Sequence, residues 1–122
     1  YLINDIVVAA LPGTLKFPVY GISEKQNKLQ TLSFNDEFLP SEIVRQIKDC
    51  SERIAKILGA KDICRIDYRY DKTTKKFYFI EANSAPRFSS TSEIGYIAKK
   101  RGLQFKDMIQ KYVTAFTSRI HN

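Results

Sequence analysis

The segment from Cys64 to Asn83 constrains the fold of this chain most strongly, because two stretches of alternating residues flank a polar turn. Alternation of polar and apolar side chains indicates a β-strand, and a short polar segment between two such strands is typical of a hairpin. We therefore predict an antiparallel hairpin over residues 62–83, with its turn at residues 71–75.

Polar side chains gather on one face of this predicted hairpin. Residues two apart in a strand share a face, so Arg65 points the same way as Asp67. Glu81 and Asn83 share a face for the same reason. If the strands pair, the oxygens of Asp67, Glu81 and Asn83 can converge, and Mg²⁺ uses such oxygens together with phosphate and water. The pattern therefore predicts a metal–phosphate site.

A half-buried sheet with a solvated polar face explains the same alternation and is the alternative interpretation. Two features favour a site. Glu81 and Asn83 end a strand that is otherwise rich in aromatic residues, and the loop that follows, residues 84–92, is rich in Ser and Thr. Hydroxyl groups in such a loop suit the binding of carboxylate or phosphate.

The order of these motifs resembles the C-terminal part of the D-alanine–D-alanine ligases, which are ATP-grasp enzymes. The resemblance covers residues 42–116 well and residues 1–40 loosely. It rests on Arg65-Ile66-Asp67, on Ile80-Glu81-Ala82-Asn83-Ser84 with Pro86, and on Ser92 ten residues before Gly102. It implies the C-terminal subdomain of an ATP-grasp fold.

The resemblance also implies a role for each polar residue. Asp67 would bind one Mg²⁺ ion, Glu81 would bridge two ions, and Asn83 would bind the second. Arg65 would stabilise the tetrahedral transition state, and Ser92 would hold the carboxylate of the second substrate. The implied cofactors are ATP and two Mg²⁺ ions, with Mn²⁺ as an alternative metal.

Further candidates implied by the resemblance lie in the first thirty residues. The first residues would correspond to the connector that lines the adenine of ATP in this family. An acidic residue that contacts the ribose follows that connector, and Asp5 is the candidate for it. The loop that closes over the phosphates is shorter here, and Lys28 or Lys25 is the candidate for its lysine. A solvated hairpin tip is the alternative interpretation for both lysines.

Two residues depart from the family's pattern. Arg87 follows Pro86 where the ligases usually carry Gly, and Glu93 follows Ser92 where they carry an apolar residue. Arg87 adds a cation to the loop expected to face the second substrate. An amine substrate that carries an extra acidic group is therefore an alternative to D-alanine as the acceptor. Arg87 and Ser92 are the predicted substrate-binding residues.

The remaining elements follow from turn residues and helical periodicity. Strands are expected over residues 1–11, 15–22 and 29–34. A first helix is expected to open at Pro40-Ser41-Glu42 and to stop at Gly59, and two more are expected over about residues 93–101 and 105–119. The predicted core face of the first helix is Ile43, Ile47, Cys50, Ile54 and Ile57. The predicted buried face of the last helix is Phe105, Met108, Ile109, Tyr112, Val113 and Phe116. This order predicts an α+β fold with helices packed on one face of a mainly antiparallel sheet.

Composition excludes several classes of protein. The chain has 122 residues, and its 43% hydrophobic and 12% aromatic content excludes a disordered chain. No apolar run approaches the ~20 residues that cross a bilayer, so no membrane partner is expected. The chain has a net charge of +7 but no aromatic–basic RNA-binding motif. A nucleic-acid-binding module is therefore a remote alternative. Cys50 and Cys64 are isolated, which favours buried free thiols in a reducing cytoplasm.

The sequence therefore predicts an ATP- and Mg²⁺-dependent carboxylate–amine ligase of the D-alanine–D-alanine ligase type, acting through an acyl phosphate in cytoplasmic peptidoglycan biosynthesis. We interpret residues 1–122 as a single domain from a larger enzyme, inactive alone. Its expected partners are amino acid or peptide substrates and the remaining domains of the parent enzyme. An ATP-grasp ligase for another amino acid or peptide, or a catalytically idle ATP-grasp-like interaction domain, are the alternatives.

Overall fold

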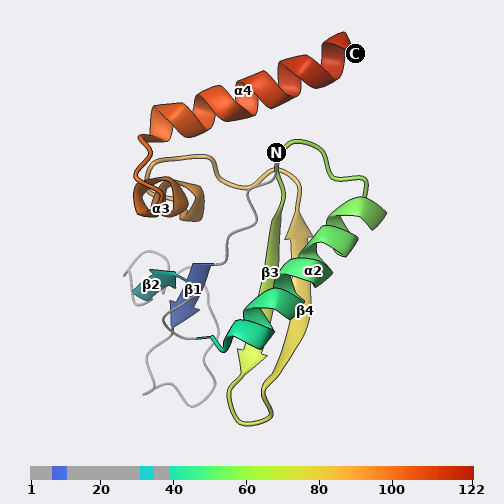
Figure 1. Ribbon diagram of the computed structural model, residues 1–122, viewed down its shortest axis with the longest axis vertical. Helices are drawn as coiled ribbons and strands as arrows, with labels where there is room; N and C mark the ends of the chain where they lie inside the picture. Colours follow the sequence, from blue (N-terminus) through green and yellow to red (C-terminus); the bar gives the residue numbers. More distant parts are fainter. Residues whose placement is uncertain (1–6, 11–30, 35–38) are drawn as a thin grey trace.

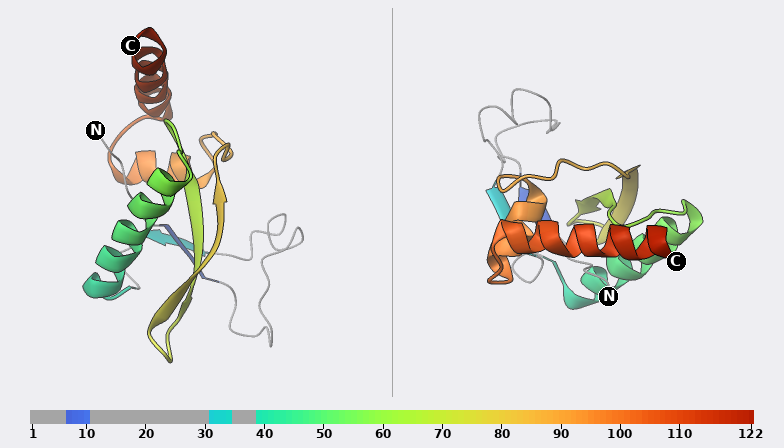
Figure 2. Two further views of the ribbon diagram at one scale, coloured as in Figure 1. Left: turned by 90° about the vertical axis from the view of Figure 1, so that its right-hand side faces the viewer. Right: turned by 90° about the horizontal axis from the view of Figure 1, so that it is seen from above.

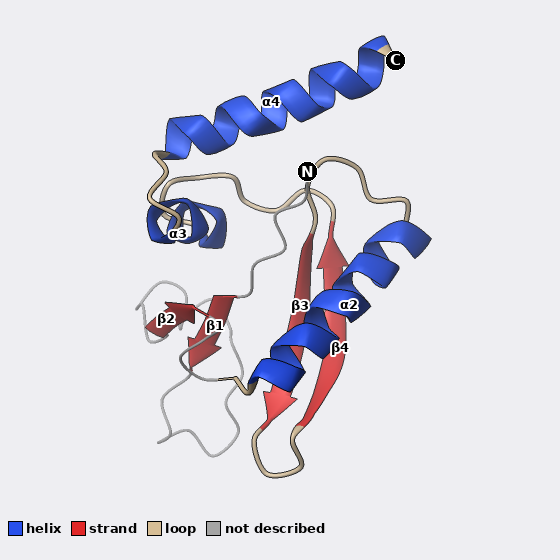
Figure 3. Ribbon diagram, in the orientation of Figure 1, coloured by secondary structure: helices blue, strands red, loops and turns tan. Residues whose placement is uncertain are grey.

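The computed structural model describes residues 7–10, 31–34 and 39–122 (Figures 1 and 3). The elements in chain order are β1 (Val7–Ala10), β2 (Thr31–Phe34), α2 (Ser41–Ile57), β3 (Arg65–Asp71), β4 (Lys76–Asn83), α3 (Glu93–Lys100) and α4 (Phe105–His121). The described strands form two antiparallel pairs, β1 with β2 and β3 with β4. The predicted α+β class with antiparallel strands is confirmed.

The hairpin β3–β4 forms where the alternation predicts it. Its turn is held by Asp71, whose carboxylate accepts hydrogen bonds from the Thr73 backbone N–H at 2.8 Å and the Thr74 hydroxyl at 2.8 Å. The Thr74 hydroxyl is the main reason why the pKa of Asp71 lies below its usual value, and the backbone N–H groups of Thr73 and Thr74 add to it. An Asp that accepts bonds two and three residues ahead is a common turn former, so the sequence fixes the end of the hairpin locally.

Helix α2 lies across one face of this hairpin (Figures 1 and 2). Its buried residues are Ile43 and Ile47, and the Ser51 hydroxyl lies 2.9 Å from the Tyr68 hydroxyl of β3. The prediction is wrong for Ile57, which is 83% exposed, because the end of α2 extends beyond the hairpin (Figure 1). The helix stops where Gly59 adopts a positive φ of 62°, which a residue without Cβ does at little cost.

Helices α3 and α4 follow the hairpin and contact each other. Gly102, with φ of 68°, ends α3: its N–H donates to Lys99 O and the next N–H, of Leu103, donates to Ala98 O. Helix α4 begins with Asp107 accepting a hydrogen bond from the Gln104 N–H at 2.9 Å. These local signals account for the boundaries of both helices.

The predicted buried face of α4 is wrong. Phe105 and Met108 are half-buried, but other members of that face are exposed, and α4 lies away from the hairpin (Figure 1). The exposed residues are Ile109, Tyr112, Val113 and Phe116. Periodicity identifies the apolar face of a helix but not the surface that covers it.

Several expectations lie outside the described residues. The second predicted strand, most of the first, and the candidates Asp5, Lys25 and Lys28 fall in this part of the chain. None of the helices that the structure describes is long and apolar enough to cross a membrane.

Candidate functional site

The predicted polar face of the hairpin forms as expected. In the register of β3 with β4, Arg65 lies opposite Asn83 and Asp67 lies opposite Glu81. Directly opposed residues of an antiparallel pair project from the same face, so the prediction that Asp67 and Glu81 share a side is confirmed. Tyr68, which contacts α2, alternates with these residues and therefore faces the other way.

A β-bulge lies next to this pair. Asp67 opposes Glu81 while Tyr68 opposes Phe79, so Ile80 is an extra residue in β4. Bulges bend a strand and redirect its side chains, and they are frequent beside functional sites. The bulge permits Glu81 to share the polar face with Asp67 although it lies only two residues from the aromatic Phe79, which opposes Tyr68 on the other side.

Arg65 is the centre of the polar face. Its Nε donates to Asp67 Oδ1 at 2.9 Å and its Nη2 to Asp67 Oδ2 at 3.1 Å. The same Nη2 lies 3.5 Å from Glu81 Oε1. The Arg65 side chain is 32% exposed, so this network is partly shielded from solvent.

Three carboxylates influence the pKa of this guanidinium. The hydrogen bonds to Asp67 raise the pKa of Arg65 above its usual value, and the charges of Glu93 and Glu81 act in the same direction. Glu93 begins α3, so a second element adds a carboxylate near the hairpin face. Arg65 thus contacts the carboxylates of Asp67 and Glu81, and the charge of Glu93 acts on it in the same direction.

Asn83 links the hairpin to the loop that follows. Its Oδ1 accepts a hydrogen bond from the Ala85 N–H at 2.9 Å, which fixes the amide and leaves its oxygen a second lone pair.

Cys64 and Cys50 are free and half-buried. Burial raises the pKa of the Cys64 thiol, which keeps it protonated near neutral pH and unsuited to bind metal.

No group of three or more Asp, Glu, His or Cys side chains among residues 7–10, 31–34 and 39–122 is arranged to hold a metal ion. Around Arg65 the hairpin offers the carboxylates of Asp67 and Glu81 and, opposite Arg65, the amide of Asn83. That number of protein ligands suits an ion such as Mg²⁺, which keeps several waters and phosphate oxygens.

The two predicted substrate-binding residues lie in the loop after β4. Ser92 is 3% exposed, and its hydroxyl donates to Ser89 O at 2.7 Å and accepts from the Ser89 N–H at 3.3 Å. Arg87 is exposed, and its Nη2 donates to the Thr91 hydroxyl at 3.0 Å. Ser92 therefore orders the loop from inside, whereas the guanidinium of Arg87 lies at its surface.

Two residues that hold this loop were not foreseen from the sequence. A Cβ on the buried Gly95 would collide with the carbonyl group of Ser90 and lie 2.7 Å from Ser89 O, so the loop approaches α3 as closely as Gly allows. A Gly within an otherwise helical pattern was the available signal. The ring of Phe88 packs against α4, 5.3 Å from the Phe105 centroid and 5.5 Å from that of Tyr112.

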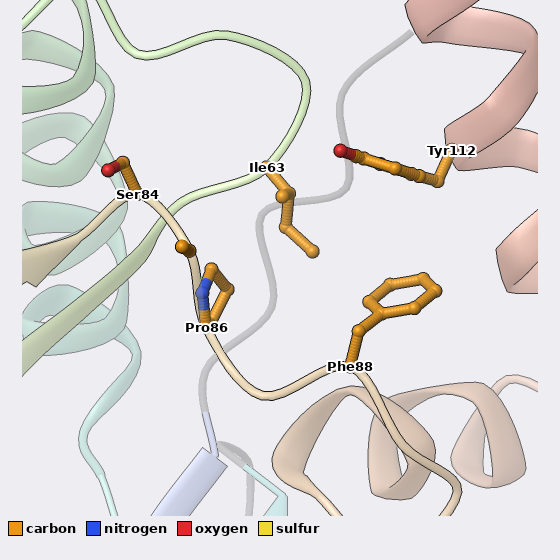
Figure 4. Close-up of a pocket in the computed structure, with 6 residues that line it drawn as sticks. Ile63, Ser84, Pro86, Phe88 and Tyr112 are labelled. Carbon is orange, nitrogen blue, oxygen red and sulfur yellow. The ribbon is translucent and has the colours of Figure 1, made fainter.

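A mainly apolar pocket of about 250 Å³ lies between the loop and α4 (Figure 4). The rings of Phe88 and Tyr112 border it on one side, and Pro86 borders it on the other (Figure 4). Its remaining lining residues are Ile63, Ser84 and Ala85. The loop that carries Arg87 is therefore supported by aromatic contacts on one side and by α3 on the other.

The chain matches a protein-family model described as "D-ala D-ala ligase C-terminus" over residues 6–114. It is 36% identical over 76 residues to a D-alanine–D-alanine ligase of Caldicellulosiruptor bescii, which is 62% of this chain and 21% of that protein. It is 31% identical over 106 residues to that of Aquifex aeolicus, covering 86% of this chain and 36% of the relative. It is 27% identical over 112 residues to the D-alanine–D-alanine ligase of Clostridium novyi, which is 90% of this chain and 33% of that protein.

The chain spans about a fifth to about a third of the length of the curated relatives that it matches. No solved structure matches it.

Proposed function

This chain belongs to the family of D-alanine–D-alanine ligase C-terminal domains, and we propose that it supplies the metal- and phosphate-binding part of the active site of such a ligase. In the proposed reaction the γ-phosphoryl group of ATP moves to a carboxylate oxygen and ADP leaves. An amine nitrogen then attacks the carbonyl carbon and loses a proton to solvent, the C–N bond forms, and phosphate leaves with the former carboxylate oxygen.

The observation that carries this proposal is the Asp67–Glu81 pair with Arg65 lying on both carboxylates. The Asp67 and Glu81 carboxylates contact one cationic group, the Arg65 guanidinium, and two carboxylates with one amide oxygen suit a hard divalent ion. Asp67, Glu81 and Asn83 would hold Mg²⁺, which supplies neutralisation of phosphate charge during phosphoryl transfer.

Arg65 has its own role in the proposal. Its charge is permanent at any working pH, and its half-buried position strengthens its action on a nearby anion. It would stabilise negative charge on the transferring phosphoryl group or on the tetrahedral centre. Loss of one such donor in other enzymes costs about 10²–10³ in rate.

The loop after β4 would bind the second substrate. The exposed guanidinium of Arg87 is a planar fork of donors that suits a carboxylate. The Ser92 hydroxyl is engaged by Ser89, so it would reach a substrate carboxylate only after the loop shifts. Asp5 and Lys28 remain the proposed contacts to ribose and phosphate.

A second candidate is a ligase of the same kind whose amine substrate carries an extra carboxylate. The observation that favours it is Arg87, since a surface cation in the acceptor loop would attract a substrate with an extra carboxylate. Both candidates share the reaction and differ in the acceptor.

Phosphate release by the full-length protein that contains this chain tests the proposal. With ATP and Mg²⁺, we expect phosphate release that depends on an added D-amino acid, together with a dipeptide seen by mass spectrometry. L-Alanine serves as the matched control substrate. Phosphate release that is independent of every amino acid tested, or no dipeptide with any of them, would contradict the proposal.

A further inference from the structure

We propose that Arg65 is a built-in counter-ion of the Asp67–Glu81 pair, which a divalent cation must displace before the site is loaded. This inference rests on the proposed function, because it requires that the hairpin face binds such a cation. It adds a competition between an internal guanidinium and the metal, and this competition sets the affinity of the site.

The contacts of Arg65 fall on the oxygens that a metal would use. Both carboxylate oxygens of Asp67 are hydrogen-bonded, Oδ1 by Nε at 2.9 Å and Oδ2 by Nη2 at 3.1 Å. Glu81 Oε1 lies 3.5 Å from the same Nη2. An ion that bridges Asp67 and Glu81 would therefore occupy the space that Nη2 now fills, and like charges at such distances repel strongly.

The sequence positions the guanidinium for this competition. Arg65 lies two residues before Asp67 on the same strand face and opposite Asn83, so Glu81 is its diagonal neighbour across the pair. Bidentate Arg–carboxylate geometry is among the stronger ionic arrangements, and the 32% exposure of Arg65 reduces screening by salt. The contact of Arg65 with Asp67 is therefore expected to lower the affinity of the hairpin face for a cation measurably.

Displacement has a consequence for the proposed chemistry. A guanidinium released from Asp67 is free to turn toward phosphate, so loading of the cation and exposure of Arg65 become one event. An empty site would keep Arg65 neutralised and a loaded site would free it.

Titration of the 122-residue chain with Mn²⁺ alone tests this inference. Binding is followed by electron paramagnetic resonance, and paramagnetic broadening of the amide signals of residues 65–67 and 81–83 locates the ion. Arg65→Met removes the charge at similar length, Arg65→Lys keeps it, and Lys56→Met removes one positive charge in the last turn of α2. Circular dichroism checks that each variant is folded.

We expect Arg65→Met to bind Mn²⁺ at the hairpin about tenfold more tightly than the unsubstituted chain, because one resident cation no longer competes. Arg65→Lys and Lys56→Met should stay within about threefold of it. Equal or weaker binding by Arg65→Met, with broadening still at the hairpin, would overturn the inference and leave the cation site standing. If no variant shows broadening there, both the inference and the proposed cation site fail.

Discussion

At the scale of single residues, Arg87 is the side chain through which the proposed choice of acceptor can be tested. It lies exposed in the loop after β4, and its guanidinium donates a hydrogen bond at 3.0 Å to the uncharged hydroxyl of Thr91. Exchange of that bond for a substrate carboxylate would replace a neutral acceptor by a charged one, which forms stronger hydrogen bonds. The contact of Arg87 with Thr91 is therefore a hydrogen bond to an uncharged group and not an ion pair.

We expect Arg87→Gly in the full-length protein to shift substrate preference toward D-alanine by about tenfold relative to an acidic amino acid. The measurement is kcat/KM for both amines in both proteins, with Arg87→Lys as a control that keeps the charge. An unchanged ratio would assign Arg87 a structural role in the loop.

Tyr68 gives the fold a dependence on alkaline pH. Burial is the main cause that raises its pKa to about 12, the hydrogen bond with Ser51 opposes this, and Cys50 adds to it. Since the unfolded tyrosine loses its proton near pH 10, the stabilisation is complete below that pH and is lost as the pH rises toward 12.

Urea unfolding between pH 8 and pH 11 measures this effect. The free energy of unfolding should fall more steeply above pH 10 in the unsubstituted chain than in Tyr68→Phe, which has no proton to lose. Parallel curves for the two proteins would refute the assignment of this pH dependence to Tyr68.

Residue types and alternation were sufficient to predict the polar face of the hairpin, with Asp67, Glu81 and Asn83 on one side. They were not sufficient to predict that Arg65 contacts both carboxylates, because that depends on a rotamer and on the diagonal between strands. The engagement of Ser92 by Ser89 was also beyond reach, since a hydroxyl in a loop has many local partners to choose from.

At the scale of elements, boundaries were predictable where a local signal exists. Gly59 and Gly102 end α2 and α3 because a positive φ is cheap for glycine, and Asp71 closes the hairpin turn. The buried face of α4 was wrong because no local signal states what covers an apolar stripe. The same reason applies to Ile57, whose place in the periodic pattern of α2 says nothing about the width of the hairpin beneath it.

Gly95 links α3 to the loop that precedes it. Alanine at this position would place Cβ against the Ser90 carbonyl group, so we expect a loss of roughly 1–3 kcal/mol in the free energy of unfolding and a displaced loop. Urea unfolding and the amide chemical shifts of residues 89–92 measure the two effects.

Gly102→Ala is the matched control, since its Cβ would meet open space and its cost comes from backbone conformation alone. It should leave the amide shifts of residues 89–92 unchanged. If Gly95→Ala also leaves them unchanged, the loop does not depend on close approach to α3.

At the scale of the whole molecule, α2 lies on one face of the hairpin (Figure 2). Tyr68 contacts α2, and Asp67 and Glu81 alternate with it, so the polar face of the hairpin is the opposite one. Among residues 39–122 the buried apolar side chains are Ile43, Ile47 and Ala98, so the core of this part is small. The chain spans about a third of relatives such as the Aquifex aeolicus ligase. We therefore propose that the nucleotide clamp is completed by other parts of the parent enzyme.

The 122-residue chain alone is accordingly expected to bind Mg²⁺-ATP weakly, with a dissociation constant on the order of 1 mM or above. A single carboxylate face offers charge neutralisation but encloses little of the nucleotide, and enclosed area contributes much of ligand affinity. Isothermal titration calorimetry measures this directly. Micromolar affinity would show that the chain holds a complete nucleotide site.

The most direct test of the central claim, that the hairpin face holds the ion on which phosphoryl transfer depends, is the Glu81→Gln substitution in the full-length protein. We predict a loss of at least about 10³-fold in kcat with an unchanged melting temperature, because the isosteric amide keeps the shape and removes the charge that would bind the metal. Glu52→Gln on α2, remote from the proposed chemistry, is the matched control and should retain activity. Turnover of Glu81→Gln at the level of the control, with the same dependence on Mg²⁺ concentration, would contradict the account.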